Sequence, residues 1–376
     1  MALRFLHLHS SFHPGGKELR AARLMTAFGK GVEHTVVSAE PGALGAASAV
    51  GKGISVAYPD DFPSLSGRPF PRRLMRLAEA MRGHDLILTY NWGAMDAVLA
   101  HTCFADHFGL APLVHHEDGF NQDEAGGLKW QRNLFRRVAL FRAAALIVPS
   151  RRLEAIALDV WKQPRGRVHR IANGIDTAAC ARVPRRDALP RLIKREGELW
   201  LGTLAGLRPV KNLPRLVRAF ASLPDPWQLV ILGEGPERAA ILVEADRLGL
   251  AHRVHLPGFA ADPTRVVGLF DLFALSSESE QFPISVVEAM AAGLAVVAPD
   301  VGDVAAMVAP DNAAFIAPAG DEAALAAALG AMAADPDLRA GLGAANQARA
   351  RSEYDEAVMI ARTRAIYARA MGREAF

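Results

Sequence analysis

The sequence predicts an α/β protein of two domains, and three observations lead to this prediction. Short apolar runs such as LRFLHL, LILTY, QLVILG and AVVAPD alternate with helix-like segments along the chain. This alternation is typical of parallel sheets that are covered by helices on both faces. A strand, a glycine-containing loop and a helix follow one another at 3–25 and again at 199–220. With 376 residues, the chain is long enough for two such Rossmann-like domains.

The charge distribution agrees with this division. Up to Val183 the sequence has 23 Lys and Arg against 16 Asp and Glu, and the remainder has 20 against 24. The segment Arg182–Glu198 is rich in Pro and Arg, as linkers often are. We therefore expect an N-terminal domain at 1–185, a C-terminal domain at 186–355 and a terminal helix at 356–376.

The composition indicates the class of protein and the cellular compartment. Hydrophobic residues make up 51% and charged residues 22%, which indicates a globular chain. Cys103 and Cys180 are the only cysteines, so we expect no disulfide framework and a reducing compartment. The start MALRFLHLHSSFHPGG lacks the apolar run of a signal peptide, and no run reaches the roughly 18 residues of a membrane span. The expectation is a cytoplasmic protein, at most peripheral on the cytoplasmic face of the inner membrane.

Two glycine- or cation-containing loops lie where predicted strands end and helices begin, which is where doubly wound sheets bind ligands. In HPGGKE, Gly15 and Gly16 would let backbone N–H groups approach a phosphate, although a Gly-Gly pair is more often only a turn. In GLRPVKN, Arg208 and Lys211 precede a helix whose dipole they oppose, so an anion such as a diphosphate would compensate them. The alternative is a solvated surface pair.

The stretch ESEQFPISVVEAMAAG places one carboxylate before a helix and another inside it. The helix should begin at Pro283, so Glu280 lies in the loop and Glu288 lies about a turn and a half into the helix. The first-turn amides of Ile284, Ser285 and Val286 form an anion site. Flanking carboxylates would accept hydroxyl groups, so this arrangement suits a nucleotide sugar. The alternative is that Glu280 only complements the helix dipole and Glu288 is a solvated surface residue.

Glu280 and Glu288 resemble the E-x7-E motif of retaining GT-B glycosyltransferases, in particular glycosyltransferase family 4. HPGGKE, ANGID (Ala172–Asp176) and GLRPVKN resemble other segments of that family, in the same order along the chain. The resemblance implies two Rossmann-like domains that face each other across a cleft, with the C-terminal helix crossing back to the first domain. It also implies transfer of a sugar from a UDP- or GDP-sugar, with retention of configuration and without a metal ion or other cofactor. The acceptor would be lipid-linked, or a polysaccharide or glycolipid of the cell envelope.

The resemblance implies a role for each residue of these segments. Glu280 would bind donor-sugar hydroxyls, and Glu288 would bind the ribose hydroxyls. Lys211 would neutralise the diphosphate together with Gly16 and the amides of Ile284 to Val286. The base would lie near Gly258 and Phe259, just after Pro257.

Two positions depart from the family pattern. An Arg commonly stands five residues before the Lys, but here that position is Gly206, and Arg208 is the nearest source of the missing charge. A His often follows the front-domain strand that ends here in PLV, where the chain reads HHEDGFNQDE. Asp118 occupies the expected position, and we favour it over His116 for the chemistry. The alternative is that Asp118 and Gly119 form only a turn.

Other functions remain as alternatives to sugar transfer. The enzyme could be a GT-B sugar-nucleotide epimerase, or the chain could bind sugar nucleotides without catalysis. A zinc site built from His7, His9, His13 and the pair at 115–116 is disfavoured, because no Cys or carboxylate completes the set.

The segment Leu128–Arg142 has an apolar stripe formed by Trp130, Leu134, Val138 and Phe141 among basic residues. We expect the stripe to face the core. The alternative is an interfacial helix that docks on anionic lipid, together with the basic segment PFPRRLMRLAEAMRG. Nucleic acid is disfavoured as a partner, because the excess of positive charge is modest and no aromatic stacking platforms are interleaved.

Overall fold

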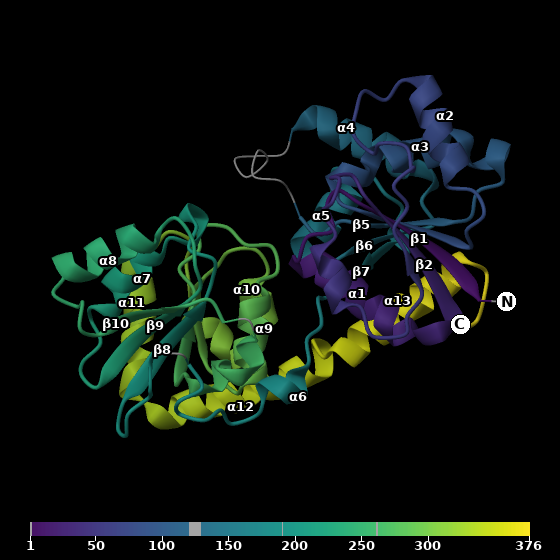
Figure 1. Cartoon of the computed structure of the whole chain (residues 1–376). Coiled ribbons are helices and arrows are strands. Elements are labelled where there is room, and N and C mark those ends of the chain that lie inside the picture. Colours follow the sequence, from purple (N-terminus) through teal and green to yellow (C-terminus); the bar gives the residue numbers. More distant parts are fainter. Residues whose placement is uncertain (1, 120–128, 190, 261) are drawn as a thin grey trace. The chain divides into compact units, whose positions relative to one another are not determined.

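The computed structural model describes residues 2–119, 129–189, 191–260 and 262–376. It divides into two compact units (Figure 1). The first contains Met1–Ala172 together with Met359–Phe376, and the second is Asn173–Val358. The domain boundaries expected from the sequence, 185/186 and 355/356, lie 13 residues after the first of these divisions and three residues before the second.

The first unit is built on a parallel sheet of seven strands in the order β3-β2-β1-β4-β5-β6-β7. Two core clusters lie on its opposite faces because successive side chains of a strand alternate: Leu3 and Phe5 of β1 face one cluster, and Leu6 and Leu8 face the other. The strands are β1 (Leu3–His9), β2 (Val32–Ser38), β3 (Val56–Ala57), β4 (Leu86–Tyr90), β5 (Leu113–His116), β6 (Ala145–Val148) and β7 (Val168–Arg170).

Helices cover both faces of this sheet. One face carries α1 (Gly16–Phe28) and α13 (Glu356–Ala370). The other carries α2 (Pro71–Ala80), α3 (Met95–Phe108), α4 (Trp130–Ala139) and α5 (Arg151–Asp159). Short 3-10 turns join these elements: η1 (Gly29–Gly31), η2 (Gly45–Ala49), η3 (Trp92–Ala94), η5 (Leu140–Arg142) and η6 (Arg165–Arg167).

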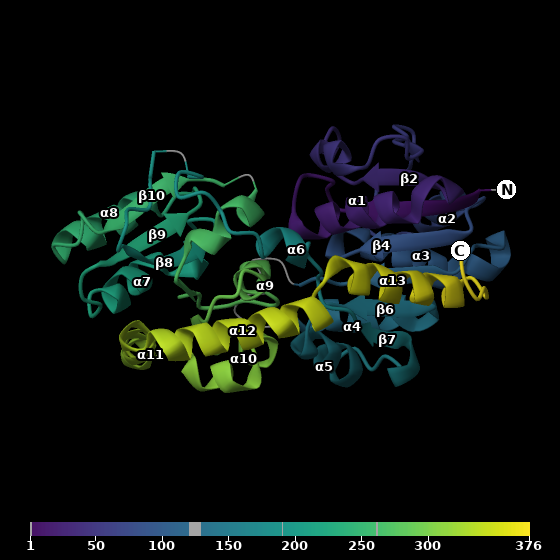
Figure 2. The same ribbon diagram turned by 90° about the horizontal axis from the view of Figure 1, so that it is seen from below.

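The last helix, α13, packs on the first unit, as the resemblance implied (Figure 2). The buried Tyr367 hydroxyl and Nε2 of His116 lie 2.7 Å apart and share a hydrogen bond. Arg364 donates a hydrogen bond to the carbonyl of Ala27 at 2.8 Å. The Phe376 ring meets the Phe5 ring edge to face, with 5.4 Å between the ring centroids. The end of the chain is therefore part of the first hydrophobic core.

The second unit has a parallel sheet of six strands in the order β10-β9-β8-β11-β12-β13. The strands are β8 (Leu199–Leu204), β9 (Trp227–Leu232), β10 (Val254–Gly258), β11 (Leu272–Ala274), β12 (Val296–Pro299) and β13 (Ile316–Ala317). The helices are α6 (Thr177–Cys180), α7 (Leu213–Phe220), α8 (Arg238–Arg247), α9 (Ile284–Ala291), α10 (Val304–Met307), α11 (Glu322–Ala334) and α12 (Pro336–Glu353). The 3-10 turns are η7 (Pro209–Lys211), η8 (Pro263–Arg265), η9 (Val267–Leu269) and η10 (Pro310–Phe315). Two parallel, helix-covered sheets confirm the predicted α/β fold of two Rossmann-like domains.

No helix in the described part of the chain is long and apolar enough to cross a membrane.

The core of the first unit contains an unusual group of histidines around Tyr90. Nδ1 of His7 lies 3.1 Å from the Tyr90 hydroxyl, and Nε2 of His7 lies 2.9 Å from Nδ1 of His34. The ring of His9 stacks on Tyr90 with 3.9 Å between the centroids. Burial lowers the pKa of His7 and His9 well below the usual value and lowers the pKa of His34 to about 4. These imidazoles are therefore neutral in the folded chain at neutral pH.

This neutrality predicts acid sensitivity of the fold. In the unfolded chain each histidine binds a proton below about pH 6.5, whereas His34 in the folded chain does so only near pH 4. The free energy of unfolding that depends on these neutral histidines is therefore fully present above pH 6.5. It falls as pH decreases toward 4, by up to about 1.4 kcal/mol per pH unit for each such histidine. Urea unfolding at pH 7.5 and pH 5 should show this loss.

Replacement of single histidines isolates the effect. His34→Gln should lose less stability between pH 7.5 and pH 5 than the wild-type chain. His107→Gln, at an exposed position of α3, should behave like the wild type. An identical pH dependence for His34→Gln and the wild type would contradict the assignment.

Candidate functional site

In the second unit, the two predicted donor-binding segments meet through an ion pair. Nζ of Lys211 lies 2.5 Å from Oε1 of Glu280, and the Ser277 hydroxyl donates to the same oxygen at 2.7 Å. The Ser276 hydroxyl donates to the backbone carbonyl of Lys211 at 2.9 Å. The side chains of Lys211 and Glu280 are only 15% and 10% exposed. A cation and a carboxylate are thus held side by side in a largely enclosed position.

Sheet topology brings these segments together. Lys211 follows β8 and Glu280 follows β11, and these strands are neighbours that run in parallel. Both loops therefore leave the sheet at the same edge. The backbone N–H of Glu278 also donates to the carbonyl of Val210 at 2.9 Å, which ties the loops directly.

Arg208 lies over the position that departs from the family pattern. A Cβ atom on Gly206 would lie 3.6 Å from Nε of Arg208, and apart from residues 205–207 no other heavy atom of the described chain lies within 4 Å of that position. The side chain of Arg208, which is exposed, therefore occupies the space that a side chain at 206 would enter. Its positive charge stands at the end of β8, close in sequence to Lys211.

The start of α9 supplies two backbone donors rather than three. The amide of Val286 donates to the carbonyl of Pro283 at 3.1 Å, so it is already engaged, which corrects the expectation that it would take part in an anion site. The amides of Ile284 and Ser285 have no acceptor among the described residues. Glu288 is half-buried and lies four residues after Ile284, on the same face of the helix.

Gly302 is a site residue that the sequence analysis missed. Its φ of 62° lies in the left-handed region, and a Cβ atom there would lie 2.5 Å from the carbonyl oxygen of Glu280 and 2.8 Å from that of Gln281. The amide of Asp303 donates to the Gln281 carbonyl at 3.2 Å. The loop after β12 therefore supports the backbone of Glu280 by an approach that only glycine permits.

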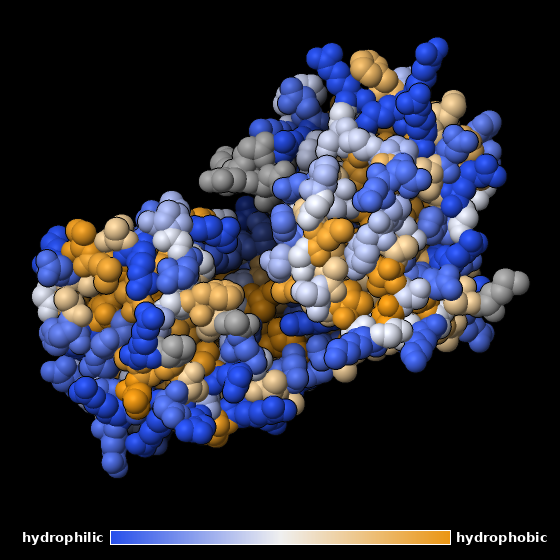
Figure 3. Space-filling view, in the orientation of Figure 1, coloured by the Kyte–Doolittle hydropathy of each residue, from blue (hydrophilic) through white to orange (hydrophobic). Residues whose placement is uncertain are grey.

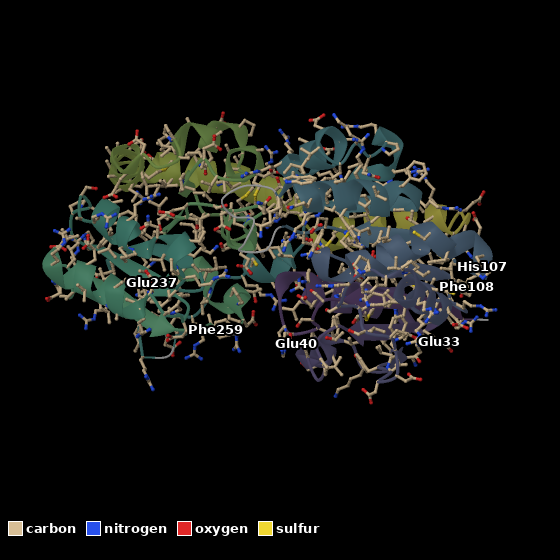
Figure 4. All side chains as sticks on the ribbon, turned by 90° about the horizontal axis from the view of Figure 1, so that it is seen from above. Glu33, Glu40, His107, Phe108, Glu237 and Phe259 are labelled. Carbon is tan, nitrogen blue, oxygen red and sulfur yellow. The ribbon has the colours of Figure 1, made fainter. Side chains whose placement is uncertain are left out.

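The predicted base-binding residues lie at the end of β10, with Gly258 as its last residue and Phe259 just after it. Gly258 has a φ of 107°, and its carbonyl accepts a hydrogen bond from the amide of Gly233 at 2.9 Å. The Phe259 side chain is 75% exposed (Figure 4). An exposed aromatic ring beside a glycine gives a flat apolar surface at this end of the sheet.

In the first unit, Asp118 is held by an arginine of α1. The two terminal guanidinium nitrogens of Arg20, Nη1 and Nη2, donate to the two carboxylate oxygens of Asp118, at 2.5 and 2.7 Å. The Asp118 amide donates to the side-chain oxygen of Asn91 at 2.8 Å, and the Asn91 amide donates to the carbonyl of His116. Asp118 is therefore fixed from both its side chain and its backbone.

His116 is buried beneath this loop. Its ring stacks on Tyr90 with 4.9 Å between the centroids, and its Nε2 is bonded to Tyr367. Burial, and then the nearby Arg20 charge, hold the pKa of His116 well below its usual value, so it is neutral at physiological pH.

The first turn of α1, where Gly16 was expected to bind phosphate, already contains a carboxylate. Glu18 is buried and pairs with Lys17 at 3.0 Å. A Cβ atom on Gly15 would lie 2.6 Å from Oε2 of Glu18, so this carboxylate folds back over the glycine pair. Glu18 therefore complements the positive end of the helix.

Glu117 was also missed, although it lies between the two residues that were singled out. It is fully buried, and Nε of Arg136 donates to its Oε2 at 3.3 Å. The adjacent His115 shares a hydrogen bond through Nδ1 with the Thr89 hydroxyl at 2.8 Å.

In the part of the chain that the structure describes, no three His, Cys, Asp or Glu side chains gather as a group that could hold a metal ion.

Comparison with known proteins matches each half of the chain to a family profile. Residues 14–179 match the family described as "Glycosyltransferase Family 4", and residues 185–349 match "Glycosyl transferases group 1". The chain is 32% identical over 272 residues to a GDP-mannose-dependent alpha-mannosyltransferase of Mycobacterium tuberculosis, covering 69% of this chain and 68% of the relative. It is 30% identical to the putative glycosyltransferase EpsF of Bacillus subtilis, covering 63% and 66%.

Solved structures resemble the whole chain. Anabaena Alr3699/HepE, in complex with UDP, has a TM-score of 0.77 at 22% identity and covers 96% of this chain and 98% of its own. The lipopolysaccharide outer core galactosyltransferase WaaB has a TM-score of 0.67 at 14% identity and covers 98% and 100%. At these identities the likeness shows the fold. The relatives named above are transferases, so the matches do not favour an epimerase or a binding protein without catalysis.

The steric role of Gly302 generates a prediction. Gly302→Ala should destabilise the second unit by more than the roughly 1–2 kcal/mol that a non-glycine residue costs in the left-handed region, because its Cβ also meets two carbonyl oxygens. Gly320→Ala is the matched control, since Gly320 has a φ of 82° and no described heavy atom within 4 Å of its Cβ position. Urea unfolding of both variants measures the difference. An equal loss in the free energy of unfolding for the two variants would contradict the steric role of Gly302.

Proposed function

The chain belongs to the glycosyltransferase group 1 family of the GT-B fold, and we propose that it transfers a sugar from a nucleotide-sugar donor with retention of anomeric configuration. The donor in this proposal is a UDP- or GDP-sugar, and the acceptor is lipid-linked, or a polysaccharide or glycolipid of the cell envelope. The observation that carries the proposal is the enclosed Lys211–Glu280 pair beside the start of α9.

The ion pair suggests how a donor is bound. Lys211 and Glu280 neutralise each other, so neither charge is buried alone. A donor diphosphate would attract Lys211 and Arg208, and the amides of Ile284 and Ser285 would donate to its oxygens. Glu280 would then accept hydrogen bonds from the sugar hydroxyls. The donor would thereby replace the Lys211–Glu280 ion pair with two sets of charge-assisted contacts, one to its diphosphate and one to its sugar hydroxyls.

The remaining donor groups fit the neighbouring residues. Glu288, on the same face of α9 as Ile284, would accept both ribose hydroxyls through its two oxygens. The base would stack on Phe259, beside Gly258. Cations and the dipole of α9 stabilise the diphosphate as it leaves, so the reaction we propose needs no metal ion.

For the first unit, we keep Asp118 over His116 as the residue that matters for the chemistry, and we propose that it meets the acceptor. Its carboxylate is partly exposed, whereas His116 is buried and bonded to Tyr367. Because Arg20 neutralises Asp118 through both oxygens, Asp118 is better suited to orient a hydroxyl than to take its proton. His116 would support the loop from below as a neutral partner.

Turnover and nucleotide binding test the proposal separately. Nucleoside diphosphate should be released from a UDP- or GDP-sugar when a lipid-linked or glycan acceptor is present, and not without one. Glu288→Ala should weaken nucleoside diphosphate binding roughly 10- to 100-fold, since it loses charge-assisted hydrogen bonds of about 1.5–3 kcal/mol. Glu280→Ala should lower turnover while nucleoside diphosphate binding stays within a few-fold. Calorimetry that shows unchanged binding for Glu288→Ala would refute the ribose assignment, and acceptor-independent release would refute transfer.

Moving one charge tests the role of Arg208. Arg208→Ala should lower turnover at least about tenfold if its guanidinium stabilises the leaving diphosphate. Adding Gly206→Arg to that variant should restore much of the turnover, because residue 206 lies outside the left-handed region and its Cβ position is then open. Arg195→Ala, at an exposed position of the same unit, is the control and should have no effect. Wild-type turnover in Arg208→Ala would assign the charge to Lys211 alone.

A further inference from the structure

The outer face of α4 is apolar and exposed. Trp130, Leu134, Val138 and Phe141 are 69%, 51%, 51% and 72% exposed. Their spacing places them along one side of α4 and the following turn η5. The expectation that this stripe faces the core is therefore wrong. Four large apolar side chains in one row on the surface indicate an interaction site rather than scattered exposure.

The charge around this face favours an anionic partner. Lys129–Arg142 contains no acidic residue and five basic ones, of which Arg136 is buried and Arg142 is paired with Asp106. The exposed Lys129 and Arg137 and the partly exposed Arg132 carry the remaining positive charge. The neighbouring helix α2 adds the exposed Arg72 and Arg76, with Phe70 and Met75 exposed beside them. Both α2 and α4 pack against α3. The surface near α2 is mainly hydrophilic, with single apolar side chains among the basic ones (Figure 3). Apolar side chains within a basic surface fit an anionic lipid interface.

The inner face of α4 is anchored by one arginine. Arg136 is fully buried, and its guanidinium lies over the rings of Trp92 and Trp161, at 4.8 and 5.1 Å from their centroids. Asn133, one turn earlier, accepts a hydrogen bond from Nε1 of Trp161 at 3.0 Å. The same helix thus presents an apolar face to the surface and a cation to the interior.

That cation compensates a buried carboxylate next to the proposed acceptor residue. Glu117 is fully buried, and its Oε1 has no partner among the described residues. Its Oε2 accepts from Arg136, and its amide is bonded to the carbonyl of Ile147. A buried carboxylate that loses its cation is strongly destabilised. Any displacement of Arg136 therefore acts on Glu117, and through the backbone on His116 and Asp118.

We propose that α4 docks its outer face on an anionic membrane surface, and that Arg136 and Glu117 transmit this docking to the segment His116–Asp118. Arg136 is a positioning residue in this scheme, because it touches Glu117 and not the substrate. The inference rests on the proposed function, in which Asp118 meets the acceptor. It adds the outer face of α4 as the docking surface. It also adds a structural connection, through Arg136 and Glu117, by which membrane docking would position His116–Asp118 for an acceptor in the membrane.

Vesicle binding tests the docking step. Sedimentation with phosphatidylcholine vesicles that contain phosphatidylglycerol should capture the chain, and 0.5 M NaCl should weaken capture at least about tenfold. Trp130→Gln with Leu134→Gln should abolish capture while nucleoside diphosphate binding is unchanged. Equal capture by pure phosphatidylcholine, or no capture by either vesicle, overturns docking. Acceptor-dependent sugar transfer, measured with a soluble acceptor, would be unaffected by that result, so the two proposals fail separately.

Hydrogen exchange tests the link. Anionic vesicles should change amide exchange in 113–118 of the wild-type chain. The double variant Glu117→Gln with Arg136→Met removes both charges of the Arg136–Glu117 pair, so neither of these two charges stays buried without the other. It should still bind vesicles, but its exchange in 113–118 should no longer respond. Arg137→Met, at the adjacent exposed position, should respond like the wild type. An unaltered response in the double variant, or a lost response in Arg137→Met, overturns the link.

Discussion

Parallel strands release their loops at one edge of a sheet, and the proposed sites of both units depend on this constraint. In the second unit, β8 and β11 are neighbours, so Lys211 and Glu280 meet although 69 positions separate them. In the first unit, β4 and β5 are neighbours, so Asn91 can hold the backbone of Asp118. No local feature of either loop would bring such partners together.

Three ion pairs join segments that are distant in sequence. Lys211 pairs with Glu280, Arg20 with Asp118, and Arg136 with Glu117. Each pair keeps a charge from being buried alone, which would cost several kcal/mol. The pairs differ in what a ligand could do. Lys211 and Glu280 are partly exposed, and in our proposal Lys211 exchanges Glu280 for a diphosphate. Arg136 and Glu117 are fully buried, and the Arg136 guanidinium lies over two tryptophan rings.

The helix α4 combines two properties that are usually separate. Its outer face carries exposed apolar side chains, and its inner face carries a buried arginine. In an ordinary amphipathic helix the apolar face covers the core. Here aromatic rings cover the arginine, so the core accepts the cation and the apolar stripe stays at the surface. This inversion is the physical basis for a membrane-docking helix that contacts the proposed acceptor segment.

The sequence by itself determined the fold class and the positions of the loops that form the proposed donor site. Strand-like runs, the GLRPVKN and ESEQFPISVVEAMAAG segments and Pro283 at a helix start are local patterns, and local patterns follow from backbone and helix-end chemistry. Tertiary structure alone decided which charges are paired and that the apolar stripe of α4 faces outward. It also decided that the Val286 amide donates to the Pro283 carbonyl and that Gly302 supports the backbone of Glu280. Periodicity gives the side of a helix on which apolar residues lie. Which side faces the core depends on residues far along the chain, such as Trp92, Glu117 and Trp161, which no window of sequence around α4 contains.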